Sequence, residues 1–211
     1  MIYRLSKKSF KGMTLVELAA VIVVSGVIGL GMTSAAQAVM LHYQTDTVRQ
    51  DLRNYGNSIM REISREMQLT QKIAIDGLNG FARIKLYKFY TDISPELVIS
   101  CRANDGIEFN NDVPLNGVLK FPSRGIYRSN QQRQIYVKDF RVTNEPDNRP
   151  GLAEFKESFL HVELTLTMVS DVMDEANAVE EDHYFYRSIF LGTAYIQKKV
   201  TNSVSGDDET V

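Results

Sequence analysis

The sequence predicts an α+β protein in which one long N-terminal helix packs against an antiparallel β-sheet. Three observations indicate this class. Residues 18–41 contain no Asp, Glu, Lys or Arg, residues 42–70 repeat apolar side chains at steps of three or four, and later segments alternate apolar and polar residues as strands do. We expect five regions: a basic segment (1–12), an apolar helix (13–41), its amphipathic continuation (42–70), a β-sheet domain (71–198) and a polar, flexible tail (199–211).

The apolar stretch is long enough to cross a membrane. Its 24 uncharged residues would form a helix of roughly 36 Å at ~1.5 Å per residue, and a bilayer's hydrocarbon core is ~30 Å thick. Cations lie only before it, and the positive-inside rule then places the N-terminus in the cytoplasm and the later domain outside. These four cations are Arg4, Lys7, Lys8 and Lys11.

One acid, Glu17, stands at the start of this apolar run. A carboxylate at mid-membrane costs ~2.5–3.5 kcal/mol even on the lenient insertion scale, so such a residue usually has a partner. A plain signal anchor supplies none, and neither does a secretory signal peptide cut after Ala38 in "AAQA". Cleavage between Gly12 and Met13 would supply one, because the new α-amino group of Met13 lies one helical turn from Glu17. The two charges could then neutralise each other within a chain or between neighbouring chains.

The stretch "KGMTLVELAAVIVV" (11–24) closely resembles the N-terminal signal of the type IV pilin and type II secretion pseudopilin family. The resemblance implies that a prepilin peptidase cuts after Gly12 and N-methylates Met13, and that Glu17 pairs with the terminal amine of an adjacent subunit. Met is less usual than Phe at the first mature position. The matching residues are Gly12, Thr14, Leu15, Val16 and Glu17.

Membership of this family would also set the fold, location and partners. It implies the pilin fold, residence in the bacterial inner membrane with the C-terminal domain in the periplasm or outside, and later incorporation into a filament. The implied partners are other pilin or pseudopilin subunits, the prepilin peptidase and an inner-membrane assembly platform. Ser34 stands where many major pilins have a helix-breaking Pro. Gly26, Gly29 and Gly31 suit close helix–helix approach in the membrane.

Beyond the apolar stretch, we expect the same helix to continue to about Leu69, before the turn-rich "IDGLNG" at 75–80. One face carries an apolar stripe that we expect to pack on the sheet domain rather than to form a coiled-coil seam. The stripe consists of Val48, Leu52, Tyr55, Ile59, Ile63 and Met67.

Strands are expected at 81–90, 96–101, 117–122, 125–129, 133–143, 158–169 and 183–192. The alternation is clearest at 158–169, which predicts a sheet with one buried face. A slip of the apolar phase between Val137 and Phe140 predicts a β-bulge. The order of the last three strands, over 133–192, also resembles minor pilins and J-type minor pseudopilins, which implies a minor subunit near the filament tip.

The sequence contains two further candidate binding sites. Major pseudopilins hold calcium with acidic C-terminal loops, so the acidic run at 171–183 is a calcium candidate, although its spacing matches no EF-hand and a solvated loop is the alternative. Arginines near Tyr127 and Tyr136 could bind DNA, which makes a pilus-associated binding module for DNA or a surface the alternative function. The calcium candidates are Asp171, Asp174, Glu175, Glu180, Glu181 and Asp182, and the arginines are Arg124, Arg128 and Arg133.

The sequence favours a non-enzymatic protein without a cofactor. It contains no GxSxG, P-loop, GxGxxG or HExxH motif. The single cysteine, Cys101, has no neighbouring His and is expected to be a buried small hydrophobe. His161 and Glu163 share one strand face, but two ligands make no structural zinc site. An enzyme secreted by cleavage after Ala38 therefore has no catalytic constellation to support it.

Overall fold

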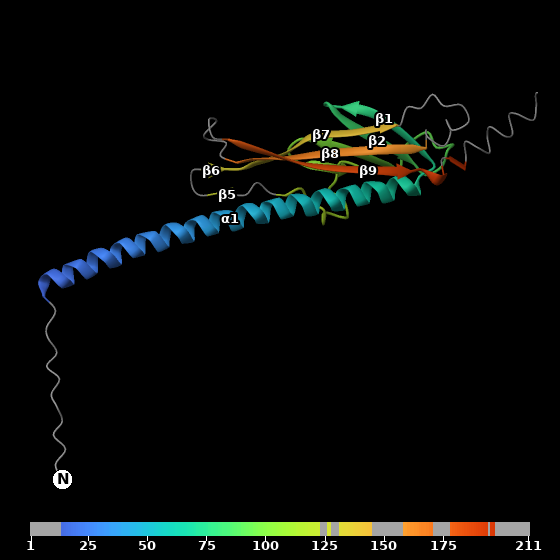
Figure 1. The fold of residues 1–211 in the computed structure, drawn as a ribbon. Helices are drawn as coiled ribbons and strands as arrows, with labels where there is room; N and C mark the ends of the chain where they lie inside the picture. The colour runs from blue at the N-terminus through green and yellow to red at the C-terminus, as the bar shows by residue number, and fades with distance from the viewer. Residues whose placement is uncertain are drawn as a thin grey trace, which may run out of the picture. The chain divides into compact units, whose positions relative to one another are not determined.

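The computed structural model describes residues 14–122, 126–127, 131–144, 158–170, 178–193 and 195–196. They form one long helix and antiparallel β-sheets, which confirms the α+β class (Figure 1). The chain divides into two compact units, one ending at Thr47 and the other beginning at Val48.

Helix α1 spans Leu15–Leu69, 55 residues. The predicted helix from about Met13 to about Leu69 is confirmed from Leu15 onward, and Met13 lies outside the described residues. At the C-terminal end, the Thr70 hydroxyl donates to the carbonyl of Met67 at 2.9 Å. This bond satisfies one of the last-turn carbonyls that have no partner within a helix.

Four strands form the first sheet in the order β1-β2-β3-β4, all antiparallel: β1 (Lys72–Leu78), β2 (Phe81–Tyr87), β3 (Leu97–Arg102) and β4 (Gly106–Phe109). Asn79 and Gly80 alone connect β1 to β2, with φ values of 54° and 85°. A two-residue turn with positive φ at both positions matches the twist of antiparallel strands, and Asn-Gly is its preferred sequence. The turn-rich segment predicted at 75–80 is therefore mostly strand.

A second antiparallel sheet has the order β7-β8-β9, with β7 at Gln134–Asn144, β8 at Phe159–Ser170 and β9 at Val179–Phe190. The register of β7 on β8 shifts between Val137 and Asp139, which confirms the predicted bulge. A separate two-residue pairing joins β5 (Ile126–Tyr127) to β6 (Gln131–Gln132).

The strand predicted at 117–122 is wrong. This segment continues a run of turns, with positive φ at Leu115, Asn116 and Gly117. Val118 is 81% exposed, whereas Phe121 is buried. These two apolar residues therefore lie in different environments. Within the described residues, the segment forms no ladder of backbone hydrogen bonds with another strand. The short β4, which begins with the left-handed Gly106, and β1 were not predicted.

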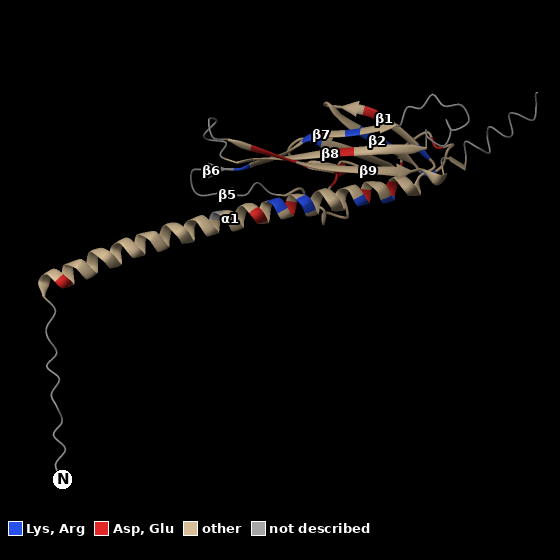
Figure 2. Cartoon of the chain, in the orientation of Figure 1, with Lys and Arg blue, Asp and Glu red and all other residues tan. Residues whose placement is uncertain are grey.

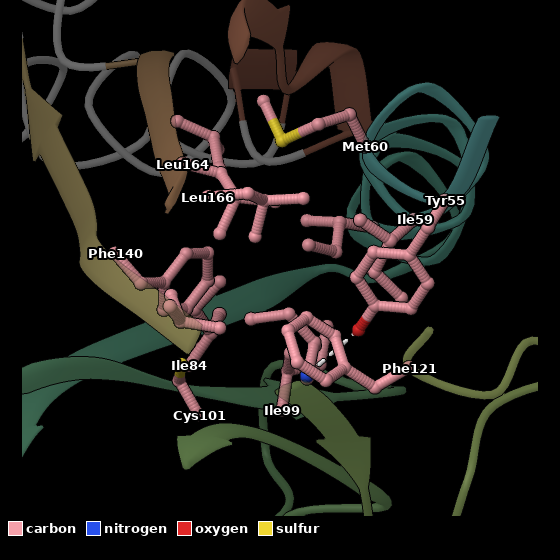
Figure 3. Close-up of a cluster of buried hydrophobic side chains, with 14 of the residues drawn as sticks. Tyr55, Ile59, Met60, Ile84, Ile99, Cys101, Phe121, Phe140, Leu164 and Leu166 are labelled. Carbon is pink, nitrogen blue, oxygen red and sulfur yellow. Dashed lines mark hydrogen bonds between the residues drawn. The ribbon is translucent and has the colours of Figure 1, made fainter. Parts of the chain in front are cut away.

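The apolar stripe of α1 forms one wall of the core of the second unit (Figure 3). Ile59 and Ile63 are completely buried, and they belong to one cluster with side chains of both sheets, among them Ile84 and Phe140. Full burial of an aliphatic side chain of this size contributes about 1.5–3 kcal/mol relative to exposure. The predicted packing of the stripe on the sheet domain is confirmed.

Tyr55 joins this core to the turn before β4. Its hydroxyl accepts a hydrogen bond from the backbone N–H of Ile107 at 2.9 Å, and its ring meets Phe121 edge-on at 5.2 Å. A Cβ at Gly106 would lie 2.5 Å from the Tyr55 hydroxyl, so the turn requires glycine for space as well as for its φ of 84°. Burial raises the pKa of Tyr55, so the phenol stays protonated.

Gly56 lies against the ring of Phe185 on β9 and has no side chain to separate them. A Cβ added at Gly56 would overlap the Phe185 ring. This close approach brings the backbone of α1 directly onto the second sheet.

Candidate functional site

The N-terminal end of α1 is held by reciprocal hydrogen bonds between Thr14 and Glu17. Thr14 donates to Glu17 Oε2 from its backbone nitrogen at 2.8 Å and from its hydroxyl at 2.9 Å, and the Glu17 nitrogen donates back to Thr14 Oγ1 at 3.3 Å. This is a capping box, which satisfies donors that the first turn leaves without partners. The acid thus has two hydrogen-bond donors within the unprocessed chain.

The other residues of the predicted processing site lie outside the described part of the chain. These are Gly12, Met13 and the four cations Arg4, Lys7, Lys8 and Lys11. Cleavage after Gly12, methylation of Met13 and pairing of Glu17 with an α-amino group therefore stay predictions.

After Glu17, the first half of α1 presents apolar side chains on every side. Figure 2 shows no charged residue along this stretch, whereas both signs appear on the second half of the helix. Val23, Leu30 and Met32 are 64%, 75% and 69% exposed. This is the one helix in the described chain that is long and apolar enough to cross a membrane.

Polar side chains in this half bond to the helix itself. Thr33 donates to the carbonyl of Gly29 at 2.8 Å, and Ser34 donates to that of Gly31 at 2.9 Å. A hydroxyl satisfied in this way does not need water, which suits an apolar environment. Apart from the neighbouring backbone of the helix itself, no atom lies within 4 Å of a Cβ built at Gly26, Gly29 or Gly31. The surface at these glycines is therefore open to close approach by another helix.

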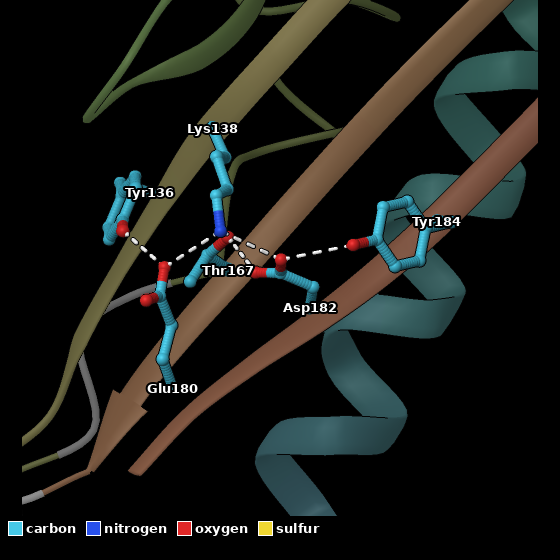
Figure 4. Close-up of polar contacts among 6 residues, drawn as sticks. All are labelled: Tyr136, Lys138, Thr167, Glu180, Asp182 and Tyr184. Carbon is cyan, nitrogen blue, oxygen red and sulfur yellow. Dashed lines mark hydrogen bonds and ion pairs between the residues drawn. The ribbon is translucent and has the colours of Figure 1, made fainter. Parts of the chain in front are cut away.

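A polar cluster occupies one face of the second sheet (Figure 4). Lys138 Nζ donates to Glu180 Oε1 at 3.0 Å and to Asp182 Oδ2 at 2.8 Å. Tyr136 also donates to Glu180, and Thr167 donates to Asp182 at 2.6 Å. The Lys138 ammonium is the main cause that lowers the pKa of Asp182 and of Glu180, with smaller contributions from the hydroxyls. The carboxylates stabilise the fold at neutral pH, and this contribution is lost as the pH falls through their lowered pKa values.

This cluster contains two of the six calcium candidates, Glu180 and Asp182. Asp171, Asp174 and Glu175 lie outside the described residues. Glu180 and Asp182 bind Lys138, whereas Glu181 points to the opposite face of β9 and binds Arg49. Strand alternation therefore separates the three described candidates instead of gathering them around one point. Among the described residues, no group of three or more His, Cys, Asp or Glu could hold a metal ion. Calcium binding by the whole run stays a prediction.

Of the predicted nucleic-acid patch, only Arg133 is described, and its side chain is buried at 4% exposure. Arg124 and Arg128 lie outside the described residues. A buried guanidinium cannot reach a phosphate backbone, so this residue does not present the charge that the patch requires.

The remaining reactive side chains have structural surroundings. Cys101 is buried, as predicted, and burial raises the pKa of its thiol to about 12. The Tyr186 hydroxyl lies 2.6 Å from Nδ1 of His161, and the two rings stack. The Tyr186 ring thus partly covers the strand face that carries His161.

An ion pair between α1 and β9 was not predicted. Arg49 Nη2 lies 2.8 Å from Glu181 Oε2, near the point where the second unit begins. The two residues are 132 positions apart, so their pairing has no local signal in the sequence. The Thr14–Glu17 bonds, by contrast, have one, because T-x-x-E before an apolar run is the capping-box pattern.

Comparison of the chain with protein-family models, with curated proteins and with solved structures finds no match in any of the three. What the chain does is therefore inferred from its own residues.

Proposed function

We propose that this chain is a structural subunit, of the minor class, of a type IV pilus or type II secretion pseudopilus. The observation that carries the proposal is a single acid, Glu17, in the first turn of a helix whose next 24 residues are uncharged, five residues after Gly12. A prepilin peptidase cuts after Gly12 and methylates Met13, and the subunit then assembles through its N-terminal helix. The protein acts by assembly and has no catalytic role of its own.

The architecture supports a pilin fold. One continuous helix has an apolar first half with no buried residue in its apolar window and a second half whose stripe is buried against antiparallel sheets. An all-round apolar surface requires a partner outside the chain, which is the bilayer before assembly and other subunits afterwards. The open surface at the three glycines suits the second environment.

Glu17 has a different hydrogen-bond partner at each stage of this proposal. In the unprocessed chain, Thr14 donates to the carboxylate twice. Cleavage then produces an α-amino group at Met13, and burial of the acid beside the amine of a neighbouring subunit removes both charges from water together. Retention of only one of the two charges in an apolar core would cost several kcal/mol. The pair therefore sets the register between neighbouring helices.

The location follows from the same pathway. Four cations before the apolar stretch keep the N-terminus in the cytoplasm, and the sheet domain lies on the other side of the inner membrane. DNA binding is not carried into the proposal, because Arg133 is buried and Arg124 and Arg128 lie outside the described residues.

The mature N-terminus tests the proposal directly. The full chain is expressed with and without a prepilin peptidase, and its terminal peptide is identified by mass spectrometry. We expect a terminus at Met13 with the mass of one added methyl group, only when the peptidase is present. A terminus at Val39 would instead establish ordinary secretion and refute the proposal.

Substitution of Glu17 separates processing from assembly. Glu17→Ala is expected to be cleaved and methylated as the parent chain is, but to be depleted from sheared filaments. Glu17→Gln is the matched control, because its amide keeps the size and can still accept from Thr14 while losing the charge. Normal assembly of both variants would refute the role in assembly that we propose for the Glu17 carboxylate.

A further inference from the structure

Two tyrosines of β9 are exposed on the face of the second sheet that points away from α1. Tyr184 and Tyr186 are 76% and 62% exposed. Strand alternation places both on the face opposite Phe185, whose ring lies against Gly56 of α1. Their Cα atoms are about 7 Å apart, because two residues of a strand span that length. Two large aromatic rings exposed side by side are typical of a binding surface.

Both rings are held in place by their hydroxyl groups. Tyr184 donates to Asp182 Oδ2 at 3.2 Å (Figure 4), and the Tyr186 hydroxyl lies 2.6 Å from His161 Nδ1. The Tyr186 and His161 rings are also stacked, with 13° between their planes. A ring that is already fixed loses little conformational entropy when a ligand packs on it. The two tyrosines therefore offer a preorganised apolar surface.

Hydrogen-bonding side chains lie beside the tyrosines on the neighbouring strands. The register places Thr165 of β8 beside Tyr184 and Glu163 of β8 beside Tyr186. Arg141 of β7 is in turn opposite Glu163. Strands lie ~4.8 Å apart, so a ligand that covers the tyrosines can also reach these groups. Glu163 is exposed, and its carboxylate forms no hydrogen bond or ion pair with any residue that the structure describes.

The charges on this face disfavour an anionic partner. In the described part of the sheet, its cations are already paired, Lys138 with Glu180 and Asp182, and Arg141 with Asp139 at 2.8 Å. Carboxylates outnumber cations here, whereas a polyanion such as nucleic acid needs an excess of Lys and Arg. A cationic partner would have to compete with the existing pairs for their carboxylates. The surface therefore suits an uncharged ligand that combines apolar patches with hydroxyl groups.

Sugars combine these two features. A pyranose ring presents C–H groups on a face and hydroxyl groups around its rim. The C–H groups carry partial positive charge, so they pack on the negative face of an aromatic ring. Adjacent hydroxyls match the paired oxygens of a carboxylate and the forked donors of a guanidinium.

From this arrangement we infer that the outer face of β7-β8-β9 binds a neutral, extended glycan chain. One sugar ring packs on Tyr184 and another on Tyr186, and their hydroxyls bond to Glu163 and Arg141. We call these four residues the glycan face.

The glycan face goes beyond the proposed function. It uses residues of the second unit only, so it does not depend on cleavage after Gly12. Two sources could supply a neutral glycan, the glycan strands of a cell wall and a free polysaccharide. Both present pyranose rings with open C–H faces, and they differ in the acetamido groups that cell-wall strands carry.

Calorimetric titration of the full chain tests the ligand class. The detergent must not be a glycoside, since its headgroup would compete. We expect cellohexaose or chitohexaose to bind, and an oligogalacturonate of the same length to bind at least about tenfold more weakly, because the face has an excess of carboxylates. A preference for chitohexaose would indicate cell-wall strands, and one for cellohexaose a polysaccharide without acetamido groups. No binding at millimolar sugar, or a preference for the anionic chain, would overturn the inference.

Substitutions test the place of binding. Tyr184→Ala and Tyr186→Ala should each weaken the neutral hexasaccharide by roughly three- to tenfold, the usual value of one aromatic contact. Tyr184→Phe and Tyr186→Phe should retain most of the affinity, because the stacking ring remains. Glu163→Ala should weaken binding by a smaller factor through loss of hydrogen bonds to hydroxyls. Unchanged affinity in the double alanine variant would overturn the inference even if sugar binds elsewhere on the chain.

A matched control removes an exposed tyrosine from another part of the same unit. Tyr90, between β2 and β3, is 54% exposed, and Tyr90→Ala should leave sugar affinity unchanged. All variants should keep the urea midpoint of the parent within error, since exposed positions contribute little to stability. A loss in Tyr90→Ala equal to that in Tyr184→Ala would overturn the assignment. Sugar binding without a Met13 terminus would refute the proposed function alone, and a Met13 terminus without sugar binding would refute the glycan face alone.

Discussion

The two halves of α1 share one backbone conformation and differ in what surrounds their side chains. In the first half, large apolar residues such as Val23 and Leu30 are mostly exposed, and no charged residue follows Glu17 until Asp46. In the second half, the apolar residues fall on one stripe that is completely buried at Leu52, Ile59 and Ile63. The helix thus changes from a segment that needs an external partner to one that is part of a core. Helical structure alone does not tell the two apart, but the distribution of charge around the helix does.

The largest expected effect comes from cutting a side chain out of the stripe. Ile63→Ala should lower the free energy of unfolding of the sheet domain by about 2–5 kcal/mol, because it loses burial and leaves a cavity. Urea unfolding in detergent, followed by tyrosine near-UV circular dichroism, measures it. The matched change in the first half, Ile28→Ala, should cost less than about 0.5 kcal/mol, since Ile28 is 52% exposed. Equal losses of unfolding free energy in the two variants would mean that both halves of α1 contribute alike to the stability of the sheet domain.

Glycines offer a second contrast of intermediate size. Gly56→Ala should destabilise the domain by about 1–3 kcal/mol, because the added methyl group overlaps the Phe185 ring. Gly29→Ala should leave domain unfolding unchanged, because apart from the neighbouring backbone of the helix itself no atom lies within 4 Å of its added Cβ. The urea midpoint of each variant gives the comparison. Adding Phe185→Leu to Gly56→Ala should recover part of the loss, and a failure to recover any would exclude this overlap as the cause.

The smallest expected effect concerns the position at which the buried half of α1 begins. Arg49 and Glu181 remain 38% and 28% exposed at their side chains, so solvent screens the pair and its coupling should stay below about 1 kcal/mol. A double-mutant cycle with Arg49→Gln and Glu181→Gln measures this coupling, which should shrink as salt is added. Zero coupling at low salt would move the effective start of the packed half toward Leu52.

Regular periodicity made most of α1 predictable. A 24-residue uncharged run and an apolar stripe at helical spacing both indicate a helix over many residues, and the structure confirms the helix to Leu69. The bulge in β7 was predictable too, because its slipped apolar phase is visible within four residues. By contrast, β1 runs directly into its Asn-Gly turn, so its second half was mistaken for loop.

The candidate sites were predictable to the extent that their residues are adjacent in sequence. The Thr14–Glu17 bonds span three positions, and a short motif was sufficient to single out both residues. By contrast, Arg61 and Arg187 line one groove, and their proximity arises only when β9 packs beside α1. The segment 117–122 shows the same limit, because Phe121 is buried through its contact with the distant Tyr55, whereas Val118 points to solvent.

Cys101 has a practical consequence for the study of this domain. Its thiol is buried in the core between the stripe of α1 and the sheets, and burial keeps it protonated at neutral pH. Because only an exposed thiolate reacts with alkylating reagents, modification of the native chain must wait for the core to open. The labelling rate of this single native cysteine therefore reports how often the core opens. Its labelling rate, compared with that of the unfolded chain, gives the fraction of time that the helix stripe spends away from the sheets.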